Sequence, residues 1–359
     1  MIVIWAARAV LAIAVSTTMY LSWAYGAMMK RNALNVDEYT KTQPRFKDRV
    51  FVAFTHWAAA GLGAASSRHS HSPPVELEAT PSPFVDKLKV NHDAASAAAL
   101  SLRGGGGGGG PPRLAIRASR GGTVFVGTIR MGFGHHRIAY AASSWGLEAG
   151  LGTYFHDLLN IKSREAGIIK KADGWYSWAS RLASELGGVA EKMWGAITLS
   201  GDENSLRNSW QMAEELKPLM MGLDKDIPVI TSHSLVGMTA VACGFKHVIN
   251  LVIDNWAQWF VVVPGAINLV QGPANYEALL RMGVPPDEVR LAGHWVPKGV
   301  HMTIEQDCRS RIVRATTGGS PRRLLVPVGG AGAQRKFVSG GVVVAVMGAS
   351  HTTRLSRLY

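Results

Sequence analysis

Two histidines directly follow a glycine-rich turn, and these residues form the pattern in the chain best suited to chemistry. The β-rich run Val124–Ile129 leads into Gly132–His136 and then into a helix-like segment, Arg137–Leu147. A strand that ends in a glycine turn at a helix N-terminus places backbone N–H groups and the positive end of the helix dipole around one small space. That space suits an anion or a developing alkoxide, and histidine exchanges protons near neutral pH. The pattern predicts an active-site loop, with an ordinary structural turn as the alternative.

Within this loop we expect one base and several substrate contacts. His135 directly follows the turn and is the candidate catalytic base or acceptor-orienting group, with a capping histidine as the alternative. His136 and Arg137 are candidates for contacting a substrate phosphate, with solvated helix residues as the alternative. Gly132 and Gly134 are expected to line the same substrate-binding site through their backbone.

Two more polar residues follow predicted strands. His233 comes after the apolar strand Ile227–Ser232, and Asp254 comes after the strand Val248–Ile253. The carboxyl ends of parallel strands meet at one edge of a sheet, which is where open α/β sheets bind ligands. His233 is therefore a candidate substrate-binding residue. Asp254 is a candidate catalytic residue that orients a histidine or the acceptor, with an ordinary turn aspartate as the alternative.

From Leu114 onward, short apolar runs alternate with helical segments, which predicts an α/β fold with a doubly wound, parallel, Rossmann-like sheet. The clearest unit is Asn268–Pro297, a βαβ piece in which Pro273 suits the first helical turn and Gly283 suits the C-cap. The tryptophan-rich region Trp175–Leu223 is expected to form helices whose tryptophans pack in the core or face a membrane.

An apolar segment near the N-terminus predicts a membrane anchor. Ala9–Met29 carries no charged residue and is long enough to cross a hydrocarbon core, which takes about 20 apolar residues. Arg8 precedes it, and Lys30 and Arg31 follow, so the positive-inside rule places the following body on the cytosolic or stromal side. A cleaved signal or an organelle transit segment is the alternative, because no acidic residue precedes Asp37.

Changes in amino-acid composition along the chain predict its division into segments. A stretch rich in Ser, His, Pro and Ala, ending in the glycine run Gly104–Gly110, predicts a disordered linker. The expected segments are an anchor at 1–31, a juxtamembrane segment of unknown role at 32–63, the linker at 64–112, a Rossmann-like domain at 113–300, a link and the start of a second domain at 301–334, and an atypical tail at 335–359.

The net charge of the chain indicates which classes of binding partner to expect. A formal net charge of +13 over 359 residues favours anionic partners such as lipid headgroups or phosphorylated substrates. The cations are spread along the chain without a zinc-finger or RNA-recognition signature, so no nucleic-acid partner is expected. Cys243 and Cys308 are the two cysteines, and we expect reduced thiols and no metal site.

Three segments resemble the GT-B glycosyltransferases, in particular the group with monogalactosyldiacylglycerol synthase, the processive diacylglycerol glucosyltransferases and the enzyme that adds N-acetylglucosamine to lipid I. The loop Gly132–His135, followed by Ile138 and Ala139, is similar to the family's Gly-His loop after the first strand. Gly283–Gly293 is similar to the segment that closes the N-terminal domain, and Leu324–Ala333 to the first strand and glycine loop of the C-terminal domain.

The resemblance implies a membrane-associated transferase built on the N-terminal half of a GT-B fold. Such an enzyme moves a sugar from a nucleotide-sugar, here a UDP-sugar donor substrate, to a membrane lipid acceptor, with no tightly bound cofactor. His135 matches the family histidine. The glycines Gly329, Gly330 and Gly332 match the turn that cradles the donor diphosphate.

The chain departs from the family pattern in several places. Phe133 replaces a glycine usual in the loop, and the segment Gly293–Pro297 is a loose version of the family's Gly-x-Pro-Val. Gln258 and Trp259 stand where a histidine is expected after Asp254. The tail after residue 334 no longer follows the pattern, so we expect a second domain that is truncated.

Two other functions fit parts of the sequence. Ser234 follows an apolar strand, as the nucleophile of an α/β-hydrolase does, although Ser232 and Val236 occupy the places of the two glycines of Gly-x-Ser-x-Gly. The chain would then be an esterase or lipase. A third hypothesis is a non-catalytic, membrane-tethered protein that binds a lipid or a partner.

Overall fold

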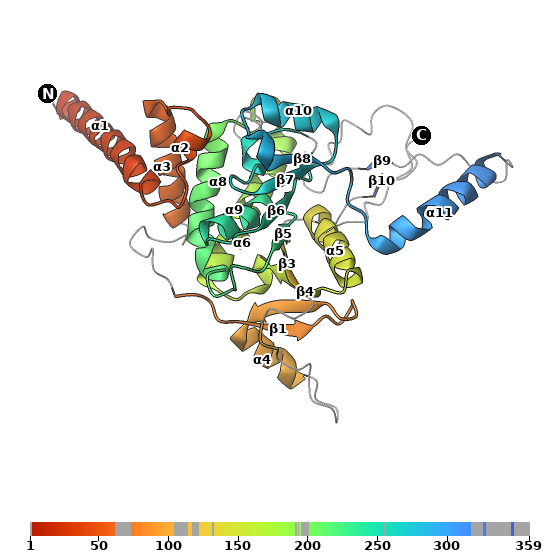
Figure 1. Ribbon diagram of the computed structural model, residues 1–359. Helices are drawn as coiled ribbons and strands as arrows, with labels where there is room; N and C mark the ends of the chain where they lie inside the picture. The colour runs from red at the N-terminus through yellow and green to blue at the C-terminus, as the bar shows by residue number, and fades with distance from the viewer. Residues whose placement is uncertain are drawn as a thin grey trace.

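The computed structural model of the chain contains a mixed α/β body, an N-terminal helical assembly and a long C-terminal helix (Figure 1). The residues that it describes are 2–61, 73–103, 114–116, 122–130, 133–190, 192, 194, 201–254, 256–316, 326–327 and 346–347. The predicted site residues Gly132, Gly329, Gly330 and Gly332 lie outside them.

The body is built on one sheet of eight strands in the order β1-β2-β4-β3-β5-β6-β7-β8. β1 is antiparallel to β2, and the remaining neighbours are parallel. This confirms the prediction of an α/β fold with a mostly parallel sheet. The strands are β1 (Leu77–Pro81), β2 (Lys89–Asp93), β3 (Thr123–Thr128), β4 (Gly152–Asp157), β5 (Val229–Thr231), β6 (Val248–Leu251), β7 (Ile267–Val270) and β8 (Val289–Leu291).

Helices connect these strands and extend beyond them. The α-helices are α1 (Ile2–Met29), α2 (Val36–Tyr39), α3 (Phe46–Gly61), α4 (Ala94–Arg103), α5 (Phe133–Glu148), α6 (Arg164–Leu186), α8 (Glu203–Leu216), α9 (Ser234–Ala242), α10 (Pro273–Arg281) and α11 (Lys298–Thr316). Short 3₁₀ turns are η1 (Leu158–Asn160), η2 (Lys217–Leu219), η3 (Trp259–Val261) and η4 (Pro286–Glu288). A separate parallel pair joins β9 (Val326–Pro327) to β10 (Val346–Met347).

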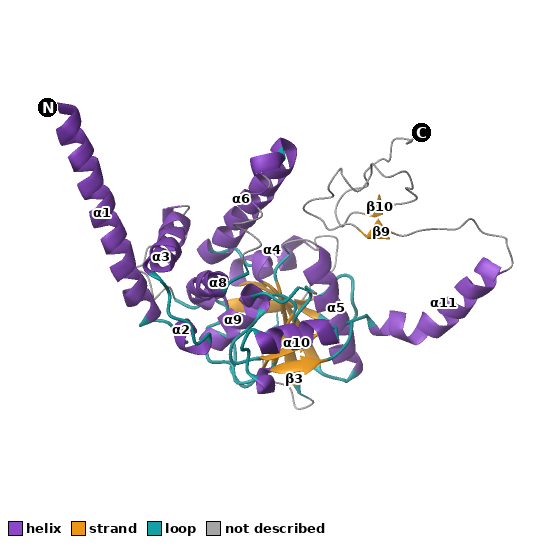
Figure 2. Cartoon of the chain, turned by 90° about the horizontal axis from the view of Figure 1, so that it is seen from above, coloured by secondary structure: helices purple, strands orange, loops and turns teal. Residues whose placement is uncertain are grey.

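The two faces of the sheet are covered by different helices (Figure 2). α5 packs on β3 and β4, where Val126, Ala139 and Phe155 form a small buried cluster. α8 and α9 pack together on the other face, above the main core that contains Phe125 and Trp210. Side chains alternate between the faces of a strand, so neighbours such as Phe125 and Val126 enter different clusters.

The structure corrects the expectation of a disordered linker at 64–112. β1, β2 and α4 lie in this range, and β2 pairs with β4 at the edge of the sheet. Asp93 stabilises the junction between β2 and α4. Its Oδ1 accepts a hydrogen bond from the Ser96 N–H at 2.8 Å, and its Oδ2 accepts one from the Lys162 N–H at 2.8 Å. Strand pairing and this cap therefore give regular structure to a segment whose composition predicts disorder. The glycine run lies outside the described residues.

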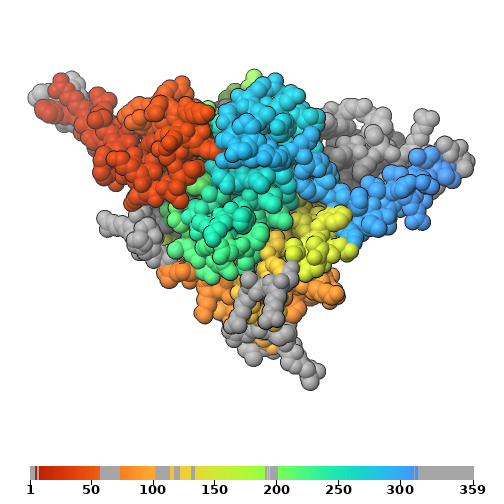
Figure 3. All heavy atoms as spheres, in the orientation of Figure 1, coloured from red at the N-terminus to blue at the C-terminus, as the bar shows by residue number. Residues whose placement is uncertain are grey.

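The N-terminal assembly is attached to the body by an ion pair between a half-buried aspartate and a buried arginine. Leu21, Tyr25 and Val52 belong to a small apolar cluster between α1 and α3, which lie side by side (Figure 3). Arg207 of α8, 2% exposed, donates from Nε to Asp37 at 2.7 Å, and Asp37 also accepts from the Tyr25 hydroxyl at 2.8 Å. The segment 32–63, for which the sequence indicates no role, therefore connects α1 to α8.

Helix α1 meets the length and hydropathy requirements of a membrane span over Arg8–Met29. An N-terminal signal sequence meets them as well. Only a small part of this helix is covered by the rest of the protein, and large apolar side chains on it, Leu11 and Trp23 among them, are exposed.

Two glycines allow α9 to lie close to the strands beneath it. A Cβ on Gly127 of β3 would come within 2.7 Å of Val236 Cγ1. A Cβ on Gly237 of α9 would come within 2.8 Å of Val263 Cγ2 and 3.0 Å of Thr231 Cγ2. Distances under 3.0 Å are steric overlaps, so α9 packs against the sheet because these side chains are missing.

We predict that Gly237→Ala lowers the free energy of unfolding by about 1–3 kcal/mol, because Val263 and Thr231 are buried and have little room to move. Urea unfolding of the detergent-solubilised protein measures the change. The control is Gly174→Ala in α6, where no atom lies within 4 Å of the new Cβ. That variant should be unchanged or more stable by up to about 1 kcal/mol. Equal stability of the two variants would contradict the packing argument.

Candidate functional site

The order of the parallel strands reverses between β3 and β5. The chain passes from β3 to β4 on one side and then returns to place β5 on the other side of β3. Right-handed crossovers then carry α5 and α9 to opposite faces, so the loops after β3 and β5 diverge. Open α/β sheets bind ligands at such a reversal, at the carboxyl ends of the strands. We call this part of the sheet edge, at the ends of β3 and β5, the crevice.

Three polar residues join the two strands at this point. The Ser232 hydroxyl, directly after β5, donates to Thr128 Oγ1 at the end of β3 at 2.9 Å. Both residues are buried. The Ser232 carbonyl lies 2.5 Å from Nδ1 of His135, which is the third residue of α5. The predicted base therefore lies at the reversal, in contact with the neighbouring strand.

This contact determines which nitrogen of His135 is available for chemistry. A carbonyl oxygen only accepts hydrogen bonds, so Nδ1 of His135 carries the proton and donates it to Ser232. In the neutral ring Nε2 then has a lone pair and can accept a proton. The arrangement is that of a general base whose ring orientation is held by the backbone.

His233 lies against His135 in the same crevice. The ring centroids are 4.6 Å apart and the planes are inclined by 40°. Nδ1 of His233 accepts a hydrogen bond from the Leu235 N–H at 3.2 Å and so caps α9. Burial lowers the pKa of His233 well below its usual range, and the nearby His135 lowers it further. His233 is therefore neutral at physiological pH, with its proton on Nε2.

A buried carboxylate, Asp157, lies at the end of β4, next to Thr128 in the sheet register. Its Oδ1 accepts from the Leu159 N–H at 3.0 Å, and its Oδ2 lies 3.5 Å from His136 Nε2 and 3.9 Å from Arg130 Nε. Asp157 and His136 form a weakly aligned pair, because neither of these two facing atoms has a hydrogen-bond partner in the described part of the chain.

The environment of His136 is apolar apart from this carboxylate. Its ring meets those of Tyr140 and Phe155 edge-on, each at 5.1 Å between centroids. Burial and the Asp157 charge raise the pKa of Tyr140, so its phenol stays protonated. The predicted phosphate contact at His136 is thus directed toward a carboxylate. Arg130, whose side chain is 57% exposed, is better placed to meet an anion that enters the crevice.

Sequence reasoning missed Asp157 and Arg130. Both follow the pattern that identified His233 and Asp254, a polar residue at or just after the carboxyl end of a strand. Asp157 ends β4, and Arg130 lies two residues after β3. Neither residue belongs to a glycine-rich turn, and spacing alone does not distinguish one polar residue at a strand end from another.

The other predicted site residues lie farther from the crevice or face solvent. Gly134 and Arg137 are exposed on the first turn of α5. Asp254 is exposed after β6, one strand beyond β5, and its main-chain carbonyl accepts from Asn275 Nδ2 at 3.0 Å. Gln258, in the place where a histidine was expected, is buried.

The segment after β8 passes along the same edge of the sheet toward α5. His294 Nδ1 donates to Gln271 Oε1 at 2.8 Å, and Gln271 Nε2 donates to the Ile253 carbonyl at 2.7 Å. Trp145 of α5 then donates from Nε1 to the Val296 carbonyl at 2.9 Å. The loose Gly-x-Pro-Val segment therefore bridges the ends of β6 and β7 to α5.

Ser234 does not have the backbone of a hydrolase nucleophile. It is the first residue of α9, after the cap at His233. A nucleophile elbow holds its serine in a strained turn. In the described part of the chain, the non-glycine residues with positive φ are Lys41 and Lys87, both remote from Ser234 in sequence. Ser234 therefore begins an ordinary helix.

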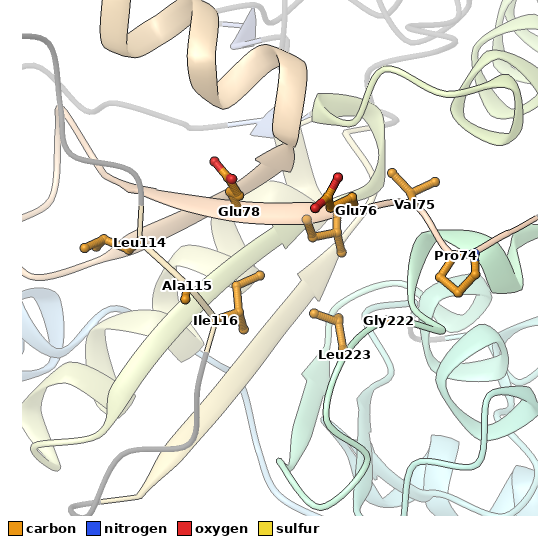
Figure 4. A pocket seen from close by; sticks show the side chains of 10 residues that line it. Pro74, Val75, Glu76, Glu78, Leu114, Ala115, Ile116, Gly222 and Leu223 are labelled. Atoms are coloured by element: carbon orange, nitrogen blue, oxygen red, sulfur yellow. The ribbon is translucent and has the colours of Figure 1, made fainter.

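A pocket of about 580 Å³ lies at the β1 edge of the sheet, away from the reversal (Figure 4). It is lined by the start of β1, by residues 114–116 and by the loop at Gly222. The carboxylates of Glu76 and Glu78 lie on its wall (Figure 4). None of the predicted catalytic or binding residues lines it. Among the described residues, no group of three or more His, Cys, Asp or Glu side chains is arranged to hold a metal ion.

Comparisons with known proteins give two matches to family models. A domain of unknown function, DUF6937, matches residues 104–280, and a second, DUF6938, matches residues 284–354. Curated proteins and solved structures showed no match to the chain. The boundary between the two models falls between α10 and β8, yet β8 pairs with β7. The sheet therefore continues across that boundary.

Buried His156 makes the stability of the body sensitive to acid. It is fully buried in β4, its Nδ1 lies 3.3 Å from Asn91 Nδ2, and burial lowers its pKa to about 4. In the unfolded chain the imidazole pKa is about 6.5. The unfolded state therefore binds the proton first as the pH falls below that value, and stability decreases.

We predict that lowering the pH from 6.5 to 4 decreases the free energy of unfolding by up to about 3 kcal/mol, because His156 is protonated more readily in the unfolded chain. The variant His156→Gln should lose this part of the pH dependence and keep the part due to His233. Urea unfolding at a series of pH values measures it, with exposed His247→Gln as the control. If the free energy of unfolding of His156→Gln depended on pH as strongly as that of the wild type, His156 would not be the source of the acid sensitivity.

Proposed function

We propose that this chain transfers a sugar from a UDP-sugar to a membrane lipid, and that the crevice between β3 and β5 is the acceptor site. The observation that carries the proposal is the contact between His135 Nδ1 and the Ser232 carbonyl, which leaves Nε2 as a base at the strand reversal. The resemblance of three segments to GT-B glycosyltransferases supports the reaction class. The body would then correspond to the N-terminal half of a GT-B fold.

The geometry supports a direct role for His135 in glycosyl transfer. Nε2 of His135 takes the proton of the acceptor hydroxyl as its oxygen forms a bond to the anomeric carbon of the sugar, and the bond from that carbon to the diphosphate oxygen breaks. The proton remains on the imidazole and UDP carries away the electron pair. A charged ring strengthens the hydrogen bond from Nδ1–H to the Ser232 carbonyl, which stabilises the protonated base.

Two nearby features suit the charges of this reaction. The first turns of α5 and α9 start at the crevice, and the N-termini of helices favour anionic groups. Arg130 adds an exposed cation at the end of β3. Donor binding is assigned by the resemblance to the glycine turn with Gly329, Gly330 and Gly332, which a phosphate approaches through backbone N–H groups.

A membrane acceptor is consistent with α1. Its apolar stretch is long enough for a single N-terminal span, and the buried contacts of Asp37 and Arg207 hold that helix to the body. The acceptor site is then carried at a membrane, with the soluble part facing the cytosol or the interior of an organelle. A lipid with a free hydroxyl is the acceptor class that suits this placement.

We predict that His135→Gln lowers kcat by about 10²–10⁴-fold, the usual contribution of a general base, with a smaller change in KM. The assay follows incorporation of label from UDP-sugars into lipid by the full chain in membranes. His247→Gln replaces an exposed histidine outside the crevice and should leave the rate unchanged.

Two further measurements distinguish sugar transfer from the alternative functions. Ser234→Ala should leave sugar transfer intact, and ester hydrolysis lost in this variant would favour the hydrolase instead. A wild-type chain that binds lipid vesicles without incorporating label would favour a non-catalytic, membrane-tethered protein. Full activity of His135→Gln would refute the assignment of the base.

A further inference from the structure

Helix α6 extends away from the body and carries exposed aromatic side chains. Its first residues are anchored, since Ile168 and Ile169 are buried, but most residues from Lys170 onward are exposed or half-buried. We call the segment 170–194 the aromatic arm, of which 170–190, 192 and 194 are described. Figure 2 shows α6 projecting from the body.

The arm has an internal structure of its own. Gly187 and Gly188 take positive φ values of 62° and 54°, which turn the chain at the end of α6. Trp194 returns to lie 5.8 Å from Trp175 and 5.6 Å from Tyr176 between ring centroids. Its Nε1 donates to Ser180 Oγ at 3.0 Å. Trp175, Tyr176 and Trp194 are therefore held in place by contacts within the arm.

Much apolar surface on the arm has no cover from the described part of the chain. Trp175 is 54% exposed, Trp178 58% and Val189 74%, and Leu182 and Leu186 are exposed beside them. Trp175, Trp178, Leu182 and Leu186 are three or four residues apart and so share one face of α6. Single exposed apolar residues are ordinary, but a set along one helix face indicates an interaction surface. Tyr176, 43% exposed, adds a tyrosine, and tryptophan and tyrosine concentrate where a membrane meets water.

The position of the arm favours a lipid bilayer as its partner. α1, α3 and α6 extend from the same side of the body (Figure 2). α1 is the helix with the length and hydropathy of a membrane span, and Arg207 on α8 fixes its base to the body. Four cations and three acidic residues lie in the arm, and the whole chain carries a formal net charge of +13, which favours anionic headgroups.

We propose that the aromatic arm inserts its tryptophans into the headgroup region of the same bilayer that α1 crosses, as a second membrane contact. The bilayer presents anionic lipids. With α1 as the first point of contact, the arm sets the angle at which the body meets the membrane surface. The inference rests on α1 and α6 and is independent of sugar transfer.

The test places an environment-sensitive fluorophore, nitrobenzoxadiazole, on the arm of the full chain. Trp178→Cys is labelled in a Cys308→Ser background, because Cys308 is exposed. Burial raises the pKa of the Cys243 thiol to about 11, so that residue reacts slowly. The matched control is Phe84→Cys, 87% exposed in the connection between β1 and β2. β1 lies at the opposite end of the body from α1 (Figure 1).

Each labelled protein is reconstituted in vesicles of phosphatidylcholine and phosphatidylglycerol that carry a spin-labelled lipid near the headgroup. We expect the spin-labelled lipid to quench fluorescence at position 178 at least about twofold, with a blue shift, and to leave position 84 unquenched. Quenching that is equal at the two positions would overturn the proposal. So would a blue shift at position 178 without quenching, which indicates a protein partner, or a chain that fails to float with the vesicles.

Discussion

The reversal of strand order between β3 and β5 is the constraint on which the site depends. Parallel strands need a crossover after each strand, and the fixed hand of these crossovers sends the helices to opposite faces where the order reverses. His135 lies in the first turn of one of these helices and His233 caps the other, so their rings meet although nearly a hundred residues separate them. Ser232 connects them, since its hydroxyl reaches β3 and its carbonyl reaches His135. Gly127 and Gly237 let α9 approach the sheet closely enough for this contact.

Several features of this arrangement could be predicted from the sequence. An apolar strand, a glycine turn and a helix start are local patterns. They were therefore sufficient to predict β3 and α5 and to place His135 and His233 after the ends of strands. The apolar N-terminal helix could also be predicted, because the number of consecutive apolar residues is a local property of the sequence. Asp254, by contrast, follows its strand as expected yet faces solvent, since the ends of parallel strands are aligned along an edge that is wider than one site.

The features that could not be predicted depend on distant contacts. β1 and β2 are short strands near one edge of the sheet, in a segment rich in Ser, His, Pro and Ala. Their regular structure depends on their pairing with each other, on the pairing of β2 with β4 and on the Asp93 contacts. Asp157 has an ordinary place at the end of a strand, and its burial beside His136 becomes visible once α5 is packed on β4. Asp37 lies in a segment without a recognisable motif, and its partner Arg207 lies 170 residues away.

The Arg207–Asp37 contact has a mechanical consequence for a protein held at a membrane. An anchor on a long flexible linker would let the body sample a hemisphere of positions above the bilayer. Here Tyr25, near the end of α1, Asp37 and Arg207 form one hydrogen-bonded set in which Tyr25 and Arg207 are buried, so the end of α1 and the start of the body move as one piece. With α1 in a bilayer, the body loses most of its freedom to tumble and keeps lateral diffusion. Its encounters with lipid then take place in two dimensions, at a height above the membrane that is set by the fold.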